Sequence, residues 1–311
     1  MSDIPEAPTY RSGKTSVAPV DSATPEAVRA AALQFLSRLA AEVSSGTVDL
    51  PCFPDIVIRI RNALVDPKTT PERTVTIVGA EPRLTARLLQ TANSVAFNQT
   101  GKHIADLKTA ITRLGHQLVQ SAAMAYAVQQ MKNEQSLRSI SRQLSELWKE
   151  SIAVASICQV MARRTKVSPD EAFLAGLLHG IGRMYIMVRA VGRGAEFGNY
   201  NTFMDMVSGW HSSIGKAVLE NWGFAGDMAD AVGNQDDSER ERRRGQEADL
   251  SDLLIAGVML GRTLKEPAPR KVESKGVAAY AVLALTDQEC AAILRHAEYQ
   301  LGSLQETLGC S

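Results

Sequence analysis

Residues 168–188 read SPDEAFLAGLLHGIGRMYIMV, the most apolar stretch of the chain. Ser168 is followed by a proline and, three residues on, by a glutamate. This is a helix start, because the serine and glutamate side chains accept hydrogen bonds from backbone N–H groups that the first turn leaves free. Gly180 and Gly182 then interrupt the apolar run. The stretch predicts two helices that meet near His179.

Helical patterns extend to both sides of this stretch. Thr24 and Thr70, each followed by a proline, mark two further helix starts, and Thr286 with Glu289 marks the last one. Residues 74–78, TVTIV, favour a strand by propensity, but a helix start precedes them and no partner strand is evident, so we assign them to a helix. Almost nothing in the chain alternates with a period of two. The predicted fold class is all-α.

The chain divides into a leader, a main region and a tail. Residues 1–23 are rich in Pro, Ser and Thr, and we expect a disordered leader there. The helical main region covers 24–265, and 266–311 form a C-terminal extension with an amphipathic helix that we expect to dock back on the domain. The residues expected to face inward on that helix are Cys290, Ile293, Leu294, Ala297 and Leu301.

The composition is that of an ordinary globular protein. The 311 residues are 45% hydrophobic and 22% charged, with 34 basic against 34 acidic side chains. Because these charges balance, no overall field attracts nucleic acid or an acidic membrane surface. We expect neither as a partner.

The sequence carries no sign of export or membrane insertion. The N-terminus lacks the apolar core of a signal peptide, and no run approaches the ~18 apolar residues of a membrane-spanning helix. The four cysteines are scattered and form no CxxC pair, which is typical of free thiols in a reducing compartment. We therefore expect a cytoplasmic protein.

Common catalytic motifs are absent from the sequence. It holds five histidines but no HExxH, no Walker loop and no GxSxG. The Gly-Ile-Gly at 180–182 has neither the preceding strand nor the third glycine of a nucleotide-binding loop. The motifs predict no cofactor.

Four segments together are similar to a known family. Residues 171–186, EAFLAGLLHGIGRMYI, resemble the EAFLAGLLHDIGKL motif of the HD phosphohydrolase superfamily. Three upstream segments resemble the N-terminal half of HDOD domains, which are HD-related output domains of bacterial signal-transduction proteins. These segments are LPCFPDIVIRIRNALVDP at 50–67, EPRLTARLLQTANSVAF at 81–97 and HIADLKTAITRLG at 103–115.

The resemblance runs from about residue 47 to about residue 265. It implies an N-terminal helical half at 24–135 joined to an HD-like helical half at 136–265. It also implies a role in signal transduction.

The resemblance permits a comparison of metal ligands. Active HD enzymes hold one or two divalent metals with a first His, a His-Asp pair, further His residues and a final Asp. His179 and His211 match two of these histidines. The remaining positions are substituted: Glu150 for the first His, Gly180 for the Asp of the pair, Gln235 and Asp236 for a tandem His pair, and Gly257 for the final Asp.

Too few donors remain to hold a divalent ion firmly. We therefore expect a degenerate metal site with no metal and no catalytic residue. A rearranged single-metal site that uses Glu150 and Asp236 is the alternative.

The resemblance also outlines a cleft in which a ligand could bind. Asn93 and Ser94 match a family signature, and Arg183 stands where the family often has Lys. With His179 and His211 they form the candidate ligand cleft. Each also has an ordinary structural interpretation: a helix cap for the Asn-Ser pair, a salt-bridged Arg, and hydrogen-bonded packing histidines.

Three functions follow from these expectations. The favoured one is a noncatalytic regulatory module that acts through contacts with a protein partner in a signalling pathway. The alternative is a nucleotide or cyclic-dinucleotide sensor that uses the vacated cleft. The third is a residual metal-dependent phosphohydrolase or phosphodiesterase.

Overall fold

The computed structural model describes residues 25–46, 48, 55–65, 68–94, 97–98, 101–193, 200–224, 226–240, 246–264 and 276–308. Over these ranges the chain forms fourteen α-helices and one 3₁₀ helix, without any strand. The all-α prediction is confirmed. The predicted leader lies outside the described residues, as do residues 266–275 of the predicted extension.

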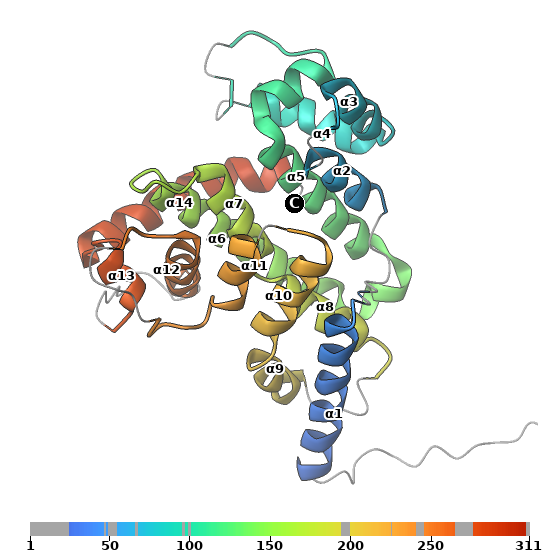
Figure 1. The fold of residues 1–311 in the computed structure, drawn as a ribbon, viewed down its shortest axis with the longest axis vertical. Coiled ribbons are helices and arrows are strands. Elements are labelled where there is room, and N and C mark those ends of the chain that lie inside the picture. Colours follow the sequence, from blue (N-terminus) through green and yellow to red (C-terminus); the bar gives the residue numbers. More distant parts are fainter. Residues whose placement is uncertain are drawn as a thin grey trace, which may run out of the picture.

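Four helices form the upper bundle of Figure 1. Here α3 (Pro71–Gly79) packs against both α2 (Asp55–Val65) and α4 (Pro82–Asn93), and all three contact the long α5 (Leu107–Asn133). The α3 helix starts as predicted, because the Thr70 hydroxyl accepts a hydrogen bond from the Arg73 N–H at 3.3 Å. The TVTIV segment is therefore helical, as expected.

The helices of the lower body surround α6 (Ser141–Ala162), which follows a 3₁₀ turn at Gln135–Ile140. The α7 and α12 helices pack along α6, as does the last helix, α14 (Asp287–Leu308). The α8 helix lies against α10 and the 3₁₀ turn. Two short helices meet around His179, as the sequence predicts. The bounds are α7 (Pro169–Leu178), α8 (Ile181–Arg189), α9 (Tyr200–Ser208), α10 (His211–Asn221), α11 (Gly226–Gly233) and α12 (Leu250–Thr263).

The first helix, α1 (Pro25–Ser44), packs on the lower body rather than on the upper bundle. It lies against α9 and α10. Glu42 accepts from Arg189 Nη2 at 2.6 Å, and the Val43 carbonyl accepts from the Asn221 side chain at 2.9 Å. The predicted N-terminal half at 24–135 therefore includes a helix whose contacts are with the other half.

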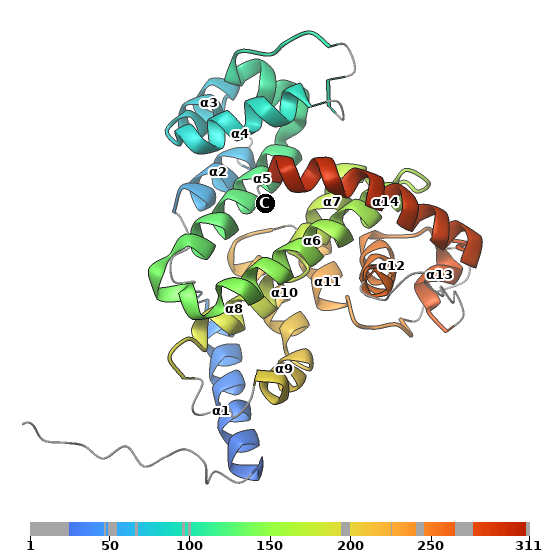
Figure 2. The same cartoon turned by 180° about the vertical axis from the view of Figure 1, so that it is seen from behind.

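The last helix docks back on the domain, as expected. After the short α13 (Ala278–Val282), α14 (Asp287–Leu308) runs along α6 and reaches α4 and α5 (Figure 2). Its start is a reciprocal cap, since Glu289 accepts from the Thr286 N–H at 2.9 Å and Thr286 accepts from the Glu289 N–H at 3.3 Å. Cys290, Ile293, Leu294 and Ala297 are buried, and the side chain of Leu301 lies outside the described residues.

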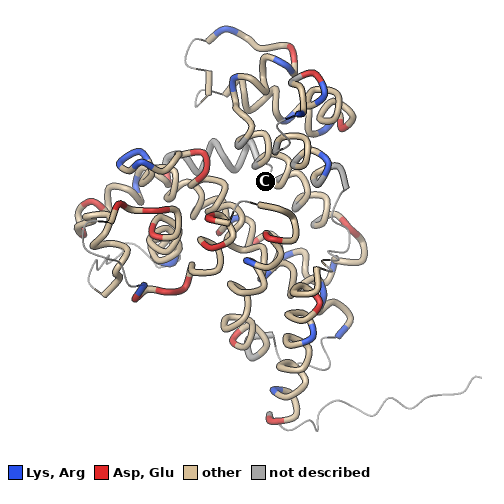
Figure 3. Tube along the Cα trace, in the orientation of Figure 1, with Lys and Arg blue, Asp and Glu red and all other residues tan. Residues whose placement is uncertain are grey.

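In the part of the chain that the structure describes, no helix combines the length and the apolar character needed to cross a membrane. Basic and acidic residues are interspersed along the described part of the trace (Figure 3).

Candidate functional site

His179 lies at the junction of α7 and α8 and is fully buried. Its Nδ1 lies 2.7 Å from the Gly176 carbonyl oxygen. Because a carbonyl only accepts, Nδ1 carries the proton and Nε2 presents a lone pair. Nε2 is buried and has no hydrogen-bond partner among the described residues. Burial lowers the pKa of His179 to about 4, so the imidazole is neutral.

A side chain at Gly180 would meet the ends of two side chains of α6. A Cβ at this position would lie 2.9 Å from Leu147 Cδ1 and 3.1 Å from Ser151 Oγ, both on α6. In the family pattern this residue is the metal-binding Asp. Here a side chain beyond Cα would require the ends of the Leu147 and Ser151 side chains to shift.

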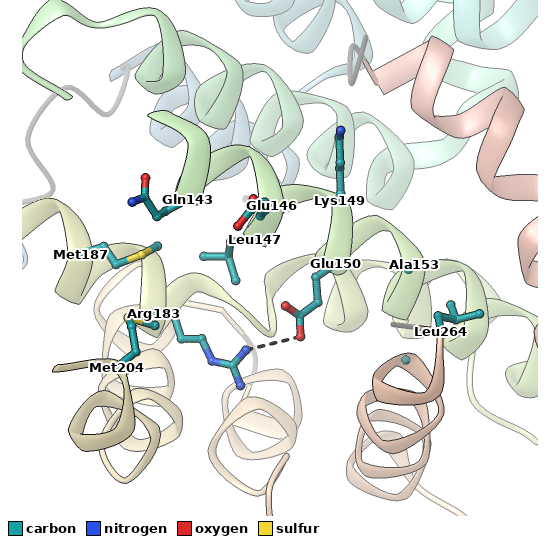
Figure 4. A pocket seen from close by; sticks show the side chains of 11 residues that line it. Gln143, Glu146, Leu147, Lys149, Glu150, Ala153, Arg183, Met187, Met204 and Leu264 are labelled. Atoms are coloured by element: carbon teal, nitrogen blue, oxygen red, sulfur yellow. Dashed lines mark hydrogen bonds and ion pairs between the residues drawn. The ribbon is translucent and has the colours of Figure 1, made fainter. Parts of the chain in front are cut away.

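Glu150 and Arg183 form an ion pair between α6 and α8. The distance from Arg183 Nη1 to Glu150 Oε1 is 3.4 Å, and both side chains are largely buried, at 17% and 15% exposure respectively (Figure 4). The other terminal nitrogen of Arg183 lies 3.3 Å from His211 Nε2 on α10. The guanidinium group therefore connects three helices.

Asp236 continues this network toward α12. Its Oδ2 lies 3.1 Å from His211 Nε2 and accepts from the Ser212 hydroxyl at 2.6 Å, while Oδ1 accepts from Arg262 Nη2 at 2.8 Å. Burial alone would raise the pKa of Asp236, but the bonds from His211 and Ser212 and the nearby charges of His211 and Arg262 outweigh it and lower the pKa.

The ionised Asp236 only accepts hydrogen bonds, so the Nε2 of His211 carries a proton toward it. The terminal nitrogen of Arg183 therefore lies close to His211 Nε2 but donates no hydrogen bond to it.

Gln235 ties α11 to the α7–α8 junction. Its side-chain nitrogen donates to the His179 carbonyl at 3.0 Å and to the Val232 carbonyl at 2.8 Å. The Oε1 atom is buried and has no hydrogen-bond partner among the described residues. Of the positions that the sequence grouped together, those that meet in space are Glu150, His179, Gly180, His211, Gln235 and Asp236.

Gly257 is placed differently from those positions. A Cβ there would overlap Cys158 Sγ and come within 4 Å of Val154 and Met161, all on α6. It therefore lies in the close contact between α12 and α6. The neighbour that α12 contributes to the network is Arg262, five residues further on.

Asn93 and Ser94 lie in the upper bundle, away from α8 and α10 (Figures 1 and 2). The Asn93 amide donates to the carbonyls of Leu89 and Ile104 and accepts from the Ile104 N–H, each at 2.8 Å. Ser94 donates to the Thr91 carbonyl at 2.8 Å and caps the helix end. These contacts join the end of α4 to the segment before α5, and the structure does not bring the pair together with His179.

A pocket of about 570 Å³ opens beside the network (Figure 4). Glu150 and Arg183 line it, whereas His179 and His211 do not. The lining comes from α6, α8, α9 and the end of α12. It consists of Gln143, Glu146, Leu147, Lys149, Glu150, Ala153, Arg183, Met187, Met204, Gly261 and Leu264.

Sequence reasoning missed Leu147, Ser212 and Arg262. The first lies one helical turn before Glu150, and the second follows His211 directly, so helix spacing and adjacency could have indicated both. No local signal marks Arg262, because its partner Asp236 is 26 residues away in the chain.

The site offers few donors that are suited to a divalent cation. Within the described ranges, no three His, Cys, Asp or Glu side chains lie together in an arrangement that could hold a metal ion. Each of the two carboxylates at the family positions contacts a guanidinium group. The donor set does not fit the His- and Asp-rich metal centre that the resemblance implies.

The model of the HDOD domain matches residues 50–238, more than half of the chain. This protein belongs to the HDOD domain family. The family predicted from the four sequence segments is confirmed.

Solved structures share this fold. A Shewanella amazonensis SB2B protein, provisionally named a metal-dependent phosphohydrolase, matches over 88% of this chain and 99% of its own, with 20% identity and a TM-score of 0.68. An HDOD domain protein of unknown function from Geobacter sulfurreducens matches over 88% and 98%, with 22% identity and a TM-score of 0.59. A provisionally named signal transduction protein from Marinobacter aquaeolei VT8 matches over 94% and 68%, with 19% identity and a TM-score of 0.59.

Among curated proteins, one from Treponema pallidum (strain Nichols) that is named only as uncharacterized is 21% identical over 197 residues. The alignment covers 60% of this chain but 37% of that protein. The chain therefore spans well under half the length of this relative.

Proposed function

We propose that this chain is a noncatalytic HDOD module that regulates a signalling pathway through contacts with a protein partner. Family membership and the signal-transduction name of the Marinobacter relative support the signalling role. The proposal that the site is noncatalytic and its metal centre degenerate rests on this chain's own residues.

The single observation that carries the proposal is the pairing of carboxylates with guanidinium groups at the family's ligand positions. Glu150 faces Arg183, and Asp236 faces Arg262 and His211. A divalent ion would have to compete with these cations for the same oxygens. At an effective dielectric of 20, two unit positive charges about 4 Å apart repel by about 4 kcal/mol. Metal binding is therefore disfavoured twice, by the missing donors and by the resident cations.

Two measurements on the purified protein test the noncatalytic part. The protein is incubated with Mn²⁺, dialysed and analysed for bound metal, and it is assayed with a chromogenic phosphodiester. We expect substoichiometric metal and no turnover above buffer. Stoichiometric metal together with turnover that a His211→Ala variant abolishes would refute the proposal, because that variant separates genuine activity from a contaminating enzyme.

The regulatory part requires a specific partner. A protein captured from the native cell must bind the purified chain with a saturable affinity. It must also bind the His211→Ala variant equally well, because regulation through a surface does not need the buried network. A partner that lost affinity for this folded variant would place the function inside the degenerate site and contradict the proposal.

A further inference from the structure

The pocket beside α6 combines one charged pair with apolar walls (Figure 4). Glu150 and Arg183 face each other, while Lys149 extends away from them. The apolar surface flanks the pair on both sides. It is formed by Leu147, Met187 and Met204 next to Arg183, and by Ala153 and Leu264 beyond Glu150.

The charged pair can bind a ligand without being separated. Its contact of 3.4 Å is at the long end for a hydrogen bond. A guanidinium group has five N–H donors, of which the contacts to Glu150 and His211 involve two, and a carboxylate offers about four acceptor sites. Both groups are mostly shielded from water, where charge-assisted hydrogen bonds are stronger than at an open surface.

We propose that this pocket binds a guanine base with its polar edge against Glu150 and Arg183. Guanine carries two adjacent N–H donor groups, which suit a carboxylate, and the acceptors O6 and N7, which suit the fork of an arginine. Its flat faces suit the thioether side chains of Met187 and Met204, which adapt to aromatic rings. No other nucleobase has two adjacent donor groups followed by two adjacent acceptors along its edge.

The size of the pocket agrees with this occupant. Its volume of about 570 Å³ lies within the range of roughly 300–1,000 Å³ that is usual for small-molecule sites, and it leaves room for a sugar. Binding of this kind requires no turnover, so the inference goes beyond the proposed regulatory role and does not depend on it.

Calorimetric titration of the full chain with guanosine and with adenosine tests the inference. These probes carry no phosphate, so any difference between them reports the base. We expect saturable binding of guanosine and at least about tenfold weaker binding of adenosine, because adenine has a single donor group, its amino group, between the acceptors N1 and N7 and so lacks paired donors for the carboxylate. Absence of saturable guanosine binding at millimolar concentration, or equal affinity for both nucleosides, would overturn the proposal.

Matched variants assign the recognition to the charged pair. Glu150→Gln should weaken guanosine at least about tenfold, since the neutral amide replaces one acceptor with a donor. Glu72→Gln is the same change outside the pocket, in the upper bundle where Glu72 pairs with the exposed Lys108, and it should leave affinity within about twofold.

Far-UV circular dichroism checks that each variant is folded. If Glu150→Gln is not, Met204→Ala takes its place, because Met204 lies on α9 outside the ion network and should weaken both nucleosides several-fold. Guanosine binding that survived either folded variant unchanged would overturn the proposal.

Discussion

The neutral, buried imidazole of His179 makes the stability of the protein sensitive to mild acid. Burial lowers the pKa of His179 to about 4, against an ordinary value of 6.5. Between these values the unfolded chain binds a proton that the folded chain does not, so the free energy of unfolding falls as the pH falls from 6.5 to about 4 and levels off below. The loss is on the order of 3 kcal/mol.

A His179→Asn variant should remove this slope, because asparagine does not titrate and its amide can still donate toward Gly176 O. Urea unfolding at a series of pH values from about 6.5 down to about 5 measures the difference between wild type and variant. This pH range excludes the titration of Glu289. The hydrogen bond from Arg164 lowers the pKa of Glu289 to about 2, so the contribution of Glu289 to the free energy of unfolding is lost only when the pH falls below its ordinary pKa of 4.5. His103→Asn is the control at an exposed histidine and should keep the wild-type slope.

Restoring the family's aspartate at Gly180 should destabilise the protein. The new side chain would displace the ends of the Leu147 and Ser151 side chains, and it would place a carboxylate at a buried position. We expect Gly180→Asp to cost about 2–4 kcal/mol in chemical denaturation and Gly180→Ala to cost less, since alanine adds only the Cβ. The prediction fails if the aspartate variant is as stable as wild type or is stabilised by Mn²⁺.

At the scale of the elements, glycines set how closely the helices of the site approach. A Cβ on Gly182 of α8 would overlap the His211 carbonyl oxygen of α10 and lie 2.7 Å from the Gly215 nitrogen. These are backbone atoms, which cannot rotate away as a side chain can. The close contact between α8 and α10 brings Arg183 within reach of His211.

Gly182→Ala should therefore cost about 3 kcal/mol or more and disturb the network. Gly226→Ala is the control, because a Cβ at that first residue of α11 meets nothing within 4 Å and alanine favours a helix. Thermal unfolding of both variants measures the contrast. Similar melting temperatures for the two would show that α8 and α10 move apart without cost.

At the scale of the whole molecule, α14 closes one side of α6 that would otherwise be exposed. It brings residues from the end of the chain against α6 in the middle and against α4 and α5 of the upper bundle (Figure 2). Leu294 is buried in this contact, and the neighbouring Arg295 faces solvent.

Leu294→Ala should lower the free energy of unfolding by about 2–4 kcal/mol, the usual cost of truncating a buried leucine. Arg295→Ala, one position along the same helix, should change it by less than about 0.5 kcal/mol. Equilibrium denaturation gives both values. Equal, small effects would mean that α14 detaches from the domain in solution.

Local chemistry made much of the fold predictable. The starts at Thr70, Ser168 and Thr286 depend on hydrogen bonds between residues three apart, so the sequence alone contains them. The family motif likewise indicated which positions gather around His179, because a shared fold preserves the order and spacing of its helices. The place of α1 on α9 and α10 had no such local signal, since those contacts join residues more than a hundred positions apart.

By itself, the sequence determined the all-α class, the helix starts, the HDOD family and the glycine at position 180. Only the tertiary structure decided that Glu150 meets Arg183, that Asp236 joins His211 to Arg262, and that a pocket opens beside them. The physical reason is the separation along the chain between the residues that interact. A capping bond depends on a few consecutive residues, whereas these ion pairs depend on how five helices pack, and packing is a property of the whole core.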